Sequence, residues 1–163
     1  MTRHLRFHTP LGPVFAIAIA GTVTGLYFEG GRHAPPIDPS WIEDPRDAPL
    51  VECERQLLEY LQGERTRFEL VVAAAGTPFQ RRIWDEIARI PYGEVLTYAE
   101  LARRAGAPGC ARAAGAATGR NPLSIIVPCH RVVGTGGALT GYAGGLERKS
   151  RLLALEGALR AAA

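Results

Sequence analysis

The residues with the strongest chemical signal are Pro128-Cys129-His130-Arg131. A cysteine is a nucleophile only as the thiolate, and a neighbouring base or positive charge raises the thiolate fraction. His130 supplies such a base and Arg131 such a charge. In a strand, adjacent side chains point to opposite faces, so Cys129 and His130 could communicate only through a bent backbone or a bridging water. The motif predicts a reactive thiol; the alternative is a buried structural cysteine followed by a chance histidine.

A run of small residues, ARAAGAATG at positions 111–119, precedes this motif. A helix that reads base edges in the major groove needs Asn, Gln or Arg facing the bases, and here only Arg112 could serve. A small-residue helix can instead approach the minor groove closely, where one protruding Arg could push into the base stack. The alternative is a helix packed tightly in a core, where Ala and Gly are equally at home.

Other spacings exclude several kinds of site. The three cysteines form no CxxC pair and the four histidines no HExxH motif, so we expect neither a disulfide framework nor a metal. The stretch Gly134–Gly137 has no helix opening on it at the spacing of a dinucleotide fingerprint, and no GxxxxGK[ST] exists, so nucleotide binding is rejected. No cofactor is expected.

Length and composition set the protein class. The chain has 163 residues, 47% hydrophobic and 21% charged, which is typical of a globular protein of one ordinary or two small domains. The longest apolar run, Val14–Ala20, is far short of the roughly 20 residues that a membrane span needs. The first residues carry Arg and His with no apolar stretch behind them, so no secretory signal is read and a cytoplasmic location is expected.

Charge divides the chain into an acidic and a basic part. Residues 1–75 carry seven Arg and ten acidic residues, a net charge of −3, whereas residues 76–163 carry eleven Arg, one Lys and six acidic residues, a net charge of +6. A basic part beside an acidic one indicates that the carboxy-terminal part meets a polyanion, although scatter in an Arg-rich composition is the alternative.

Turn and periodicity signals place the elements that must hold these residues. The first part predicts strands at Leu5–His8, Val14–Ala20 and Val23–Phe28, followed by a long loop at Gly30–Pro49. It then predicts a helix at Leu50–Gln62, ended by Gly63, and a fourth strand at Phe68–Val72. The apolar stripe of that helix includes Cys53, which favours packing over chemistry. The linker 73–76 coincides with the change in charge, so two domains, 1–75 and 76–163, are predicted.

The second part predicts a helix-turn-helix followed by a hairpin. Capping boxes at Thr77–Gln80 and Thr97–Glu100 open two helices, the first carrying Trp84 into the core. A third helix is predicted from Pro108 to about Gly119, followed by a strand at Ile125–Val127. A glycine-rich hairpin at Gly134–Gly145 and a last helix at Leu146–Glu156 complete the prediction. Together these elements indicate a winged-helix DNA-binding domain.

Two strings carry a family resemblance: NPLSIIVPCHRVV at 121–133 and GYAGGL at 141–146. They resemble the O6-alkylguanine-DNA alkyltransferases, and the resemblance runs over roughly residues 77–157. The first 75 residues match only in length and order of elements. The resemblance implies an α/β ribonuclease-H-like domain at 1–75 and a mainly α winged helix-turn-helix domain at 76–163.

The resemblance also implies a mechanism without a cofactor. Cys129 would take the alkyl group from O6 of guanine irreversibly, once per molecule. His130 would accept the thiol proton through a water, with Glu156 orienting and charging the imidazole. Tyr98 would donate to N3 of the guanine, and Asn121 would brace the turn that carries the cysteine.

The implied partner is the minor groove of double-stranded DNA, bound by a monomer with the O6-alkylguanine flipped out. Arg112 would fill the space that the nucleotide leaves. Ala143 stands where the family often has Ser, and its backbone N–H would be the donor to O6. Residues implied to contact DNA or the base are Arg112, Ala113, Ala114, Thr118, Val132, Tyr142, Ala143 and Gly144.

Three other functions compete with this interpretation. A lesion-binding protein without alkyl transfer would lack the acceptor, and Cys129 is present. A winged-helix transcription regulator would need base-reading residues on the third helix, which Ala113 to Ala117 do not supply. A thiol hydrolase would turn over repeatedly.

Overall fold

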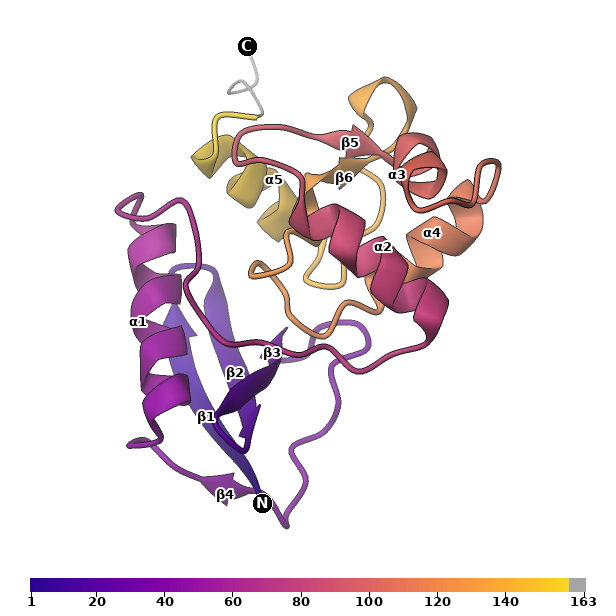
Figure 1. The fold of residues 1–163 in the computed structure, drawn as a ribbon. Coiled ribbons are helices and arrows are strands. Elements are labelled where there is room, and N and C mark those ends of the chain that lie inside the picture. The colour runs from indigo at the N-terminus through magenta and orange to yellow at the C-terminus, as the bar shows by residue number, and fades with distance from the viewer. Residues whose placement is uncertain (159–163) are drawn as a thin grey trace. The chain divides into compact units, whose positions relative to one another are not determined.

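The structure is a computed structural model that describes residues 1–158, and it forms two compact units. Unit 1 comprises Met1–Ala75 together with Pro122–Ser124, and unit 2 comprises Gly76–Asn121 and the residues from Ile125 onward. Figure 1 shows the elements in chain order. An α/β unit is thus followed by a mainly helical one.

Unit 1 is a four-stranded sheet with one helix. The strands are β1 (Thr2–Thr9), β2 (Gly12–Ile19), β3 (Thr22–Phe28) and β4 (Ile42–Glu43), in the order β3-β2-β1-β4. The first three pair antiparallel, whereas β4 runs parallel to β1. The three predicted strands are confirmed, but β4 lies in a segment predicted to be entirely loop.

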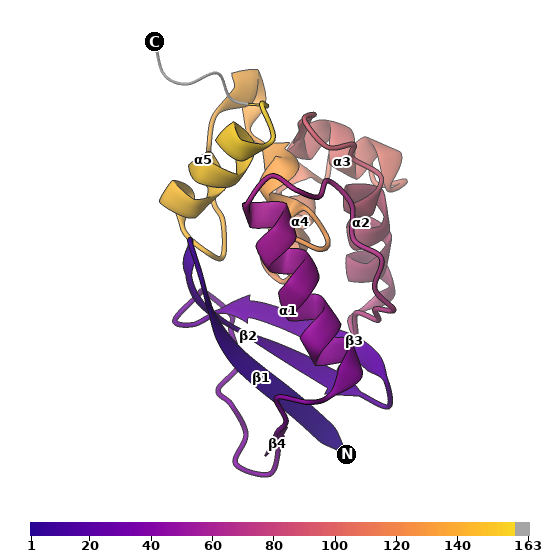
Figure 2. The ribbon, with the colours of Figure 1, turned by 90° about the vertical axis from the view of Figure 1, so that its left-hand side faces the viewer.

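The helix α1 (Ala48–Leu61) lies along this sheet (Figures 1 and 2). Its buried residues recur at helical spacing, which gives it one face for the sheet: Leu50, Cys53, Gln56, Leu57 and Tyr60. Gly63 follows with φ +78°, a conformation that glycine adopts without strain. The predicted helix and the packing role of Cys53 are therefore confirmed.

The strand predicted at Phe68–Val72 is wrong. Only Val72 pairs, in an isolated parallel bridge with Val23. The side-chain amide of Gln56 instead forms two hydrogen bonds with the backbone of Glu69. It donates to the oxygen at 3.1 Å and accepts from the N–H at 2.8 Å. A side chain that satisfies both backbone groups removes the need for a ladder.

The same free edge of β3 also carries the segment Pro122–Ser124. The N–H of Leu26 donates to the oxygen of Pro122 at 2.8 Å, and the N–H of Ser124 donates to the oxygen of Leu26 at 3.0 Å. Residues that directly precede the Cys129 motif in sequence are therefore bonded to β3.

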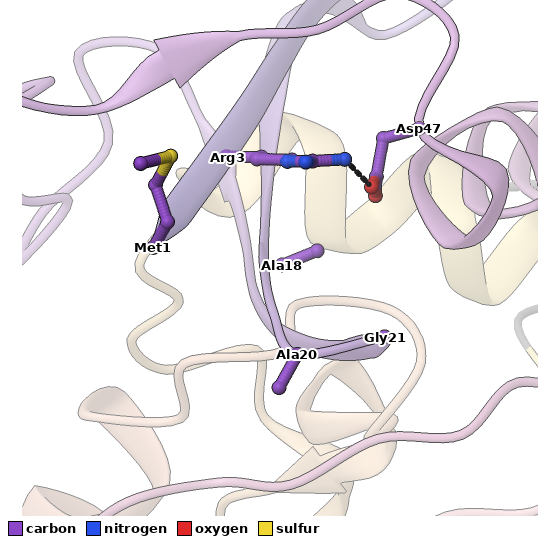
Figure 3. A pocket seen from close by; sticks show the side chains of 6 residues that line it. All are labelled: Met1, Arg3, Ala18, Ala20, Gly21 and Asp47. Atoms are coloured by element: carbon purple, nitrogen blue, oxygen red, sulfur yellow. Dashed lines mark hydrogen bonds and ion pairs between the residues drawn. The ribbon is translucent and has the colours of Figure 1, made fainter.

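A pocket in unit 1 lies beside the start of β1 (Figure 3). Its lining residues are Met1, Arg3, Ala18, Ala20, Gly21 and Asp47. The guanidinium of Arg3 reaches Asp47 at 3.0 Å and Asp44 at 3.2 Å, which joins β1 to the residue that caps α1. Arg3 is 45% exposed, so water screens this contact and its stabilisation is small.

Within residues 1–158, unit 2 contains the four helices and two short strands that surround the Cys129 motif. They are α2 (Pro78–Ala88), β5 (Leu96–Thr97), α3 (Tyr98–Arg104), α4 (Ala111–Gly119), β6 (Val132–Val133) and α5 (Leu146–Leu155), with β5 and β6 parallel. Trp84 of α2 is buried as predicted, together with Ile83 and Ile87. No helix among residues 1–158 is long and apolar enough to span a membrane.

The two predicted capping boxes differ. At α2 the box is complete, because Thr77 accepts from the N–H of Gln80 and the Gln80 side chain accepts from the N–H of Thr77. At α3 only Thr97 accepts from the N–H of Glu100. The Glu100 carboxylate binds Arg103 and Arg104 instead, so the second half of that box is wrong.

Three boundaries in unit 2 also need correction. Helix α4 begins at Ala111 rather than Pro108, since Gly109 lies in the left-handed region at φ +81°. The strand predicted at 125–127 is a turn. The hairpin predicted at 134–145 is a loop with a short 3-10 turn, closed by a bond from the N–H of Gly134 to the oxygen of Ala138. Six glycines and two prolines at 122–145 favour turns over a ladder.

Candidate active site around Cys129

The residues Cys129–Arg131 form one 3-10 turn, not a strand. The N–H of Cys129 donates to the oxygen of Val127 at 2.8 Å, and that of Arg131 to Pro128 at 2.9 Å. Successive residues of such a turn differ in direction by about a third of a circle rather than half. The bent backbone that the motif required is therefore present.

The thiol of Cys129 is buried, with the residue 4% exposed. Burial raises the pKa of this thiol, and a hydrogen bond from Asn121 and the positive charge of Lys149 offset only part of the rise. The resting sulfur is therefore a protonated thiol at neutral pH. It needs a base before it can act as a nucleophile.

Asn121 holds the turn that leads into the motif. Its Nδ2 donates to the oxygen of Val127 at 2.8 Å, and the residue is buried. Inside the turn, Ile125 has φ +71°, which is unusual for a β-branched residue and is kept only where the surroundings enforce it. Asn121 thus connects the end of α4 to the residue two before Cys129.

His130 is paired with Glu156 inside unit 2. Nε2 of His130 lies 3.0 Å from Oε2 of Glu156, and neither side chain is exposed. A carboxylate only accepts, so Nε2 carries the proton and Nδ1 is the basic nitrogen. Burial lowers the pKa of His130 and outweighs the opposite effect of Glu156, which keeps the imidazole neutral at pH 7. The arrangement provides a buried base one residue from the thiol.

Arg131 binds the same carboxylate from the other side. Its Nε donates to Oε1 of Glu156 at 2.7 Å and its Nη2 to Oε2 at 2.8 Å, while Nη1 donates to the oxygen of Ile90 at 2.6 Å. Glu156 is therefore a buried, doubly bound group at the end of α5. Although it lies at a helix end, this carboxylate is therefore not solvated.

Lys149 is a buried charged residue beside the motif that sequence reasoning missed. Its ammonium is buried and donates to the oxygens of Val132, Thr140 and Gly141 at 2.6, 3.2 and 3.0 Å. Burial lowers its pKa to about 8. Two signals could have found it: it is the one lysine in the sequence, and it lies three residues from both Leu146 and Leu152 on the apolar stripe of α5.

Comparisons with known proteins identify the family of this chain. A family model described as 6-O-methylguanine DNA methyltransferase, DNA binding domain, matches residues 78–158. The methylated-DNA–protein-cysteine methyltransferase of Methanosarcina acetivorans is 44% identical over 154 residues, covering 93% of this chain and 96% of that protein. The relative of the same name from Mycolicibacterium paratuberculosis is 45% identical, covering 93% and 92%.

The chain belongs to the methylated-DNA–protein-cysteine methyltransferase family. The resemblance predicted from the sequence is confirmed. Among solved structures, Mycobacterium tuberculosis OGT in complex with DNA has a TM-score of 0.88 and 41% identity, covering 95% of this chain and 92% of that one. The M. tuberculosis O6-methylguanine methyltransferase has a TM-score of 0.85 and 40% identity, covering 100% and 97%.

Tyr98 lies beside the glycine-rich loop. Its hydroxyl donates to the oxygen of Thr140 at 2.9 Å, and burial raises its pKa, so the phenol remains a donor at neutral pH. The Lys149 ammonium lies 5.8 Å from the centroid of the Tyr98 ring. A methyl group at Gly115 would lie 3.6 Å from that ring, so α4 and Tyr98 are in contact.

The residues of α4 divide into an exposed and a buried face. Arg112 and Ala113 are exposed, whereas Ala114 and Thr118 face the interior. The Thr118 hydroxyl donates to the oxygen of Ala114 at 2.7 Å. Trp84 of α2 fixes the helix by donating from Nε1 to the oxygen of Ala117 at 2.8 Å. Within α4, the exposed residues other than Arg112 are alanines, Ala113 and Ala116.

The remaining predicted base-contacting residues lie in and beside the loop that follows the motif. Tyr142, Ala143 and Gly144 are half-buried. Val132 is fully buried, and its oxygen is taken by Lys149. Among residues 1–158, no three His, Cys, Asp or Glu side chains are placed to hold a metal ion.

Proposed function

We propose that this protein repairs O6-alkylguanine in DNA by transferring the alkyl group to Cys129. The sulfur attacks the alkyl carbon, a carbon–sulfur bond forms as the carbon–oxygen bond to O6 breaks, and guanine leaves. The supporting observation is the buried Cys129 thiol on the same turn as the neutral, carboxylate-bound His130. A thioether does not hydrolyse under cellular conditions, so each molecule acts once.

The proton leaves the thiol before the attack. Nδ1 of His130 accepts it through a water, and Glu156 stabilises the resulting imidazolium through Nε2. Tyr98 releases the Thr140 oxygen and donates to N3 of the guanine as negative charge develops on the leaving base. Asn121 holds the turn, and the backbone N–H of Ala143 donates to O6. No cofactor takes part.

Intact mass spectrometry tests this function directly. After incubation with a duplex that carries O6-methylguanine, the protein is expected to gain one methyl group, mapped to the peptide that contains Cys129. Product should stop at one equivalent of protein, because the acceptor is consumed. Continued turnover would indicate a thiol hydrolase, and tight binding without a mass change would indicate a lesion-binding protein; either would reject the proposal.

The DNA partner is expected to bind through its minor groove. Arg112 and Ala113 on the exposed face of α4 approach the duplex, and Arg112 enters the stack while the damaged nucleotide flips out towards Tyr142 and Gly144. The inward-facing Ala114 and Thr118 support the helix, and Val132 lines the site through its backbone. We place the protein in the cytoplasm as a monomer.

The charge of unit 2 predicts a strong salt dependence. Phosphate contacts release counterions, so the affinity for duplex DNA should fall steeply with salt and depend little on sequence. Arg112→Ala should in addition slow repair in duplex more than the reaction with free O6-methylguanine, because the free base needs no flipping. The measurement compares single-turnover rates on both substrates.

Arg120→Ala is the matched control for that variant. Arg120 is exposed at the other end of α4, so its removal takes away the same charge without affecting the stack. It should weaken DNA binding but leave the rate with the free base and the rate at saturating duplex unchanged. Equal losses on both substrates in Arg112→Ala would refute a flipping role.

The finer description of the fold is also a proposal. Residues 1–75 form a ribonuclease-H-like α/β domain, supported by the antiparallel β1–β3 with α1 along the sheet. The domain expected at 76–163, of which residues 159–163 lie outside the described part of the chain, is a winged helix-turn-helix domain. In it α3, the Gly106–Cys110 turn and α4 are the helix-turn-helix, and the loop 134–145 is the wing.

A further inference from the structure

Arg131 is a buried ionisable group that the transfer mechanism above does not use. Three of its nitrogens donate, two to the two oxygens of Glu156 and one to the backbone oxygen of Ile90. Its guanidinium also lies 5.7 Å from the centroid of the Tyr92 ring. A bidentate contact of this kind fixes the plane of a carboxylate as well as its charge.

The Glu156 carboxylate therefore accepts hydrogen bonds from two residues at once. Its Oε2 accepts from Nη2 of Arg131 at 2.8 Å and from Nε2 of His130 at 3.0 Å. A carboxylate that faced His130 alone in this buried site would favour an imidazolium, which cannot accept a proton from the thiol. With Arg131 in place, the pair carries no net charge.

We propose that Arg131 is a positioning residue for the alkyl transfer, which offsets the charge of Glu156 and orients its carboxylate so that His130 remains a neutral base. This inference rests on the proposed role of His130. It assigns to the arginine of the motif a task different from supplying charge to the thiol. The bonds of Arg131 lead to Glu156 and Ile90, whereas the positive charge acting on Cys129 is that of Lys149.

The other charged and titratable groups around His130 are compatible with this task. Lys149 of α5 and Arg131 both lower the pKa of His130, and Glu156 raises it. Cys129 on the same turn is a neutral thiol at rest. Tyr92 lies against the Arg131 guanidinium and donates to the oxygen of Leu155 at 3.3 Å. Glu156 is thus the group whose charge Arg131 has to offset.

Two substitutions of opposite sign test the inference. Arg131→Met keeps the length of the side chain but leaves Glu156 facing His130 alone, so the pKa of His130 should rise by about 1–2 units. Glu156→Gln leaves Arg131 uncompensated beside His130, so that pKa should fall. The pKa is read from the imidazole carbon-bound proton signals of the intact protein by NMR between pH 4 and 9, with His130→Ala used to assign the signal.

The rate of methyl transfer gives the second readout. In Arg131→Met the acid limb of the single-turnover pH profile should move to higher pH by the same amount, so the loss should be larger at pH 6 than at pH 8. Arg131→Lys, which keeps the charge but not the bidentate contact, should restore the limb to its wild-type position. Arg89→Met, at an exposed arginine paired with Glu86, is the matched control and should behave as wild type.

The outcomes separate the inference from the function on which it rests. Opposite shifts of the His130 pKa in Arg131→Met and Glu156→Gln support it. A folded Arg131→Met with an unshifted His130 pKa, or with one loss at every pH, overturns it while wild-type transfer to Cys129 still stands. If Arg131→Met does not fold, Glu156→Gln and Arg131→Lys decide by the same NMR signal. A wild type that gains no methyl group instead rejects the proposed function.

Discussion

Cys129→Ala is expected to abolish methyl transfer completely while leaving the affinity for duplex DNA unchanged. The thiol is the only group in the proposed reaction that forms a bond to the alkyl carbon. Cys129 is buried on a 3-10 turn, whereas the residues of α4 that would meet the duplex are exposed. Intact mass after incubation with an O6-methylguanine duplex measures transfer, and a binding titration with the same duplex measures affinity.

The two other cysteines provide matched controls. Cys53 is buried in α1, where burial raises the pKa of its thiol to about 12, and Cys110 is exposed at the start of α4. Cys53→Ala and Cys110→Ala should both gain one methyl group as the wild type does. A methyl group on Cys129→Ala, or loss of transfer in Cys53→Ala with the fold intact, would show that the acceptor has been misassigned.

His130→Ala is expected to slow transfer by about 10²-fold or more at neutral pH, as found when a positioned base is removed. The structure explains why the base matters: burial raises the pKa of the Cys129 thiol, so very little thiolate forms unaided at pH 7. His130 can act there because burial lowers its own pKa, so it is already neutral. The measurement is the single-turnover rate with an O6-methylguanine duplex.

The lowered pKa of His130 sets the direction in which the transfer rate should change with pH. A histidine with a lowered pKa loses its basic form only as the pH falls below 6.5, so the wild-type rate should hold near neutrality and decline in acid. In His130→Ala hydroxide must remove the proton, so raising the pH from 7 to 9 should recover part of the lost rate. Because Lys149, with a pKa of about 8, titrates in both proteins, the ratio of the two rates is compared at each pH.

His4→Ala is the control for the loss of a buried histidine. His4 is buried in β1 of unit 1 and has no part in the proposed reaction, so this variant should react at the wild-type rate. A thermal melt of each variant separates chemistry from unfolding. Wild-type speed in His130→Ala at pH 7, or a deficit unchanged at pH 9 in folded protein, would mean that His130 is not the base.

The family and most of the regular elements could be predicted from the sequence, because they depend on residues that are neighbours in the chain. The stripe of α1 repeats every three or four residues, and the capping box of α2 joins Thr77 to Gln80 three positions later. The motif Pro128-Cys129-His130-Arg131 is likewise contiguous. Such short-range rules do not extend to 125–127 or 134–145, where apolar and glycine-rich runs indicated a strand and a hairpin but the chain forms turns.

Only the tertiary structure decided which charged side chains of the site contact one another. Arg131 meets Glu156 across 25 positions and Ile90 across 41, and no local pattern reveals which charges share a buried space. The same holds for Lys149, whose ammonium satisfies three backbone oxygens of β6 and the loop. Sequence by itself determined that a thiol and an imidazole are adjacent. Burial by the whole of unit 2 determined that both are neutral at rest, because taking a charge out of water costs more than the nearby partners return.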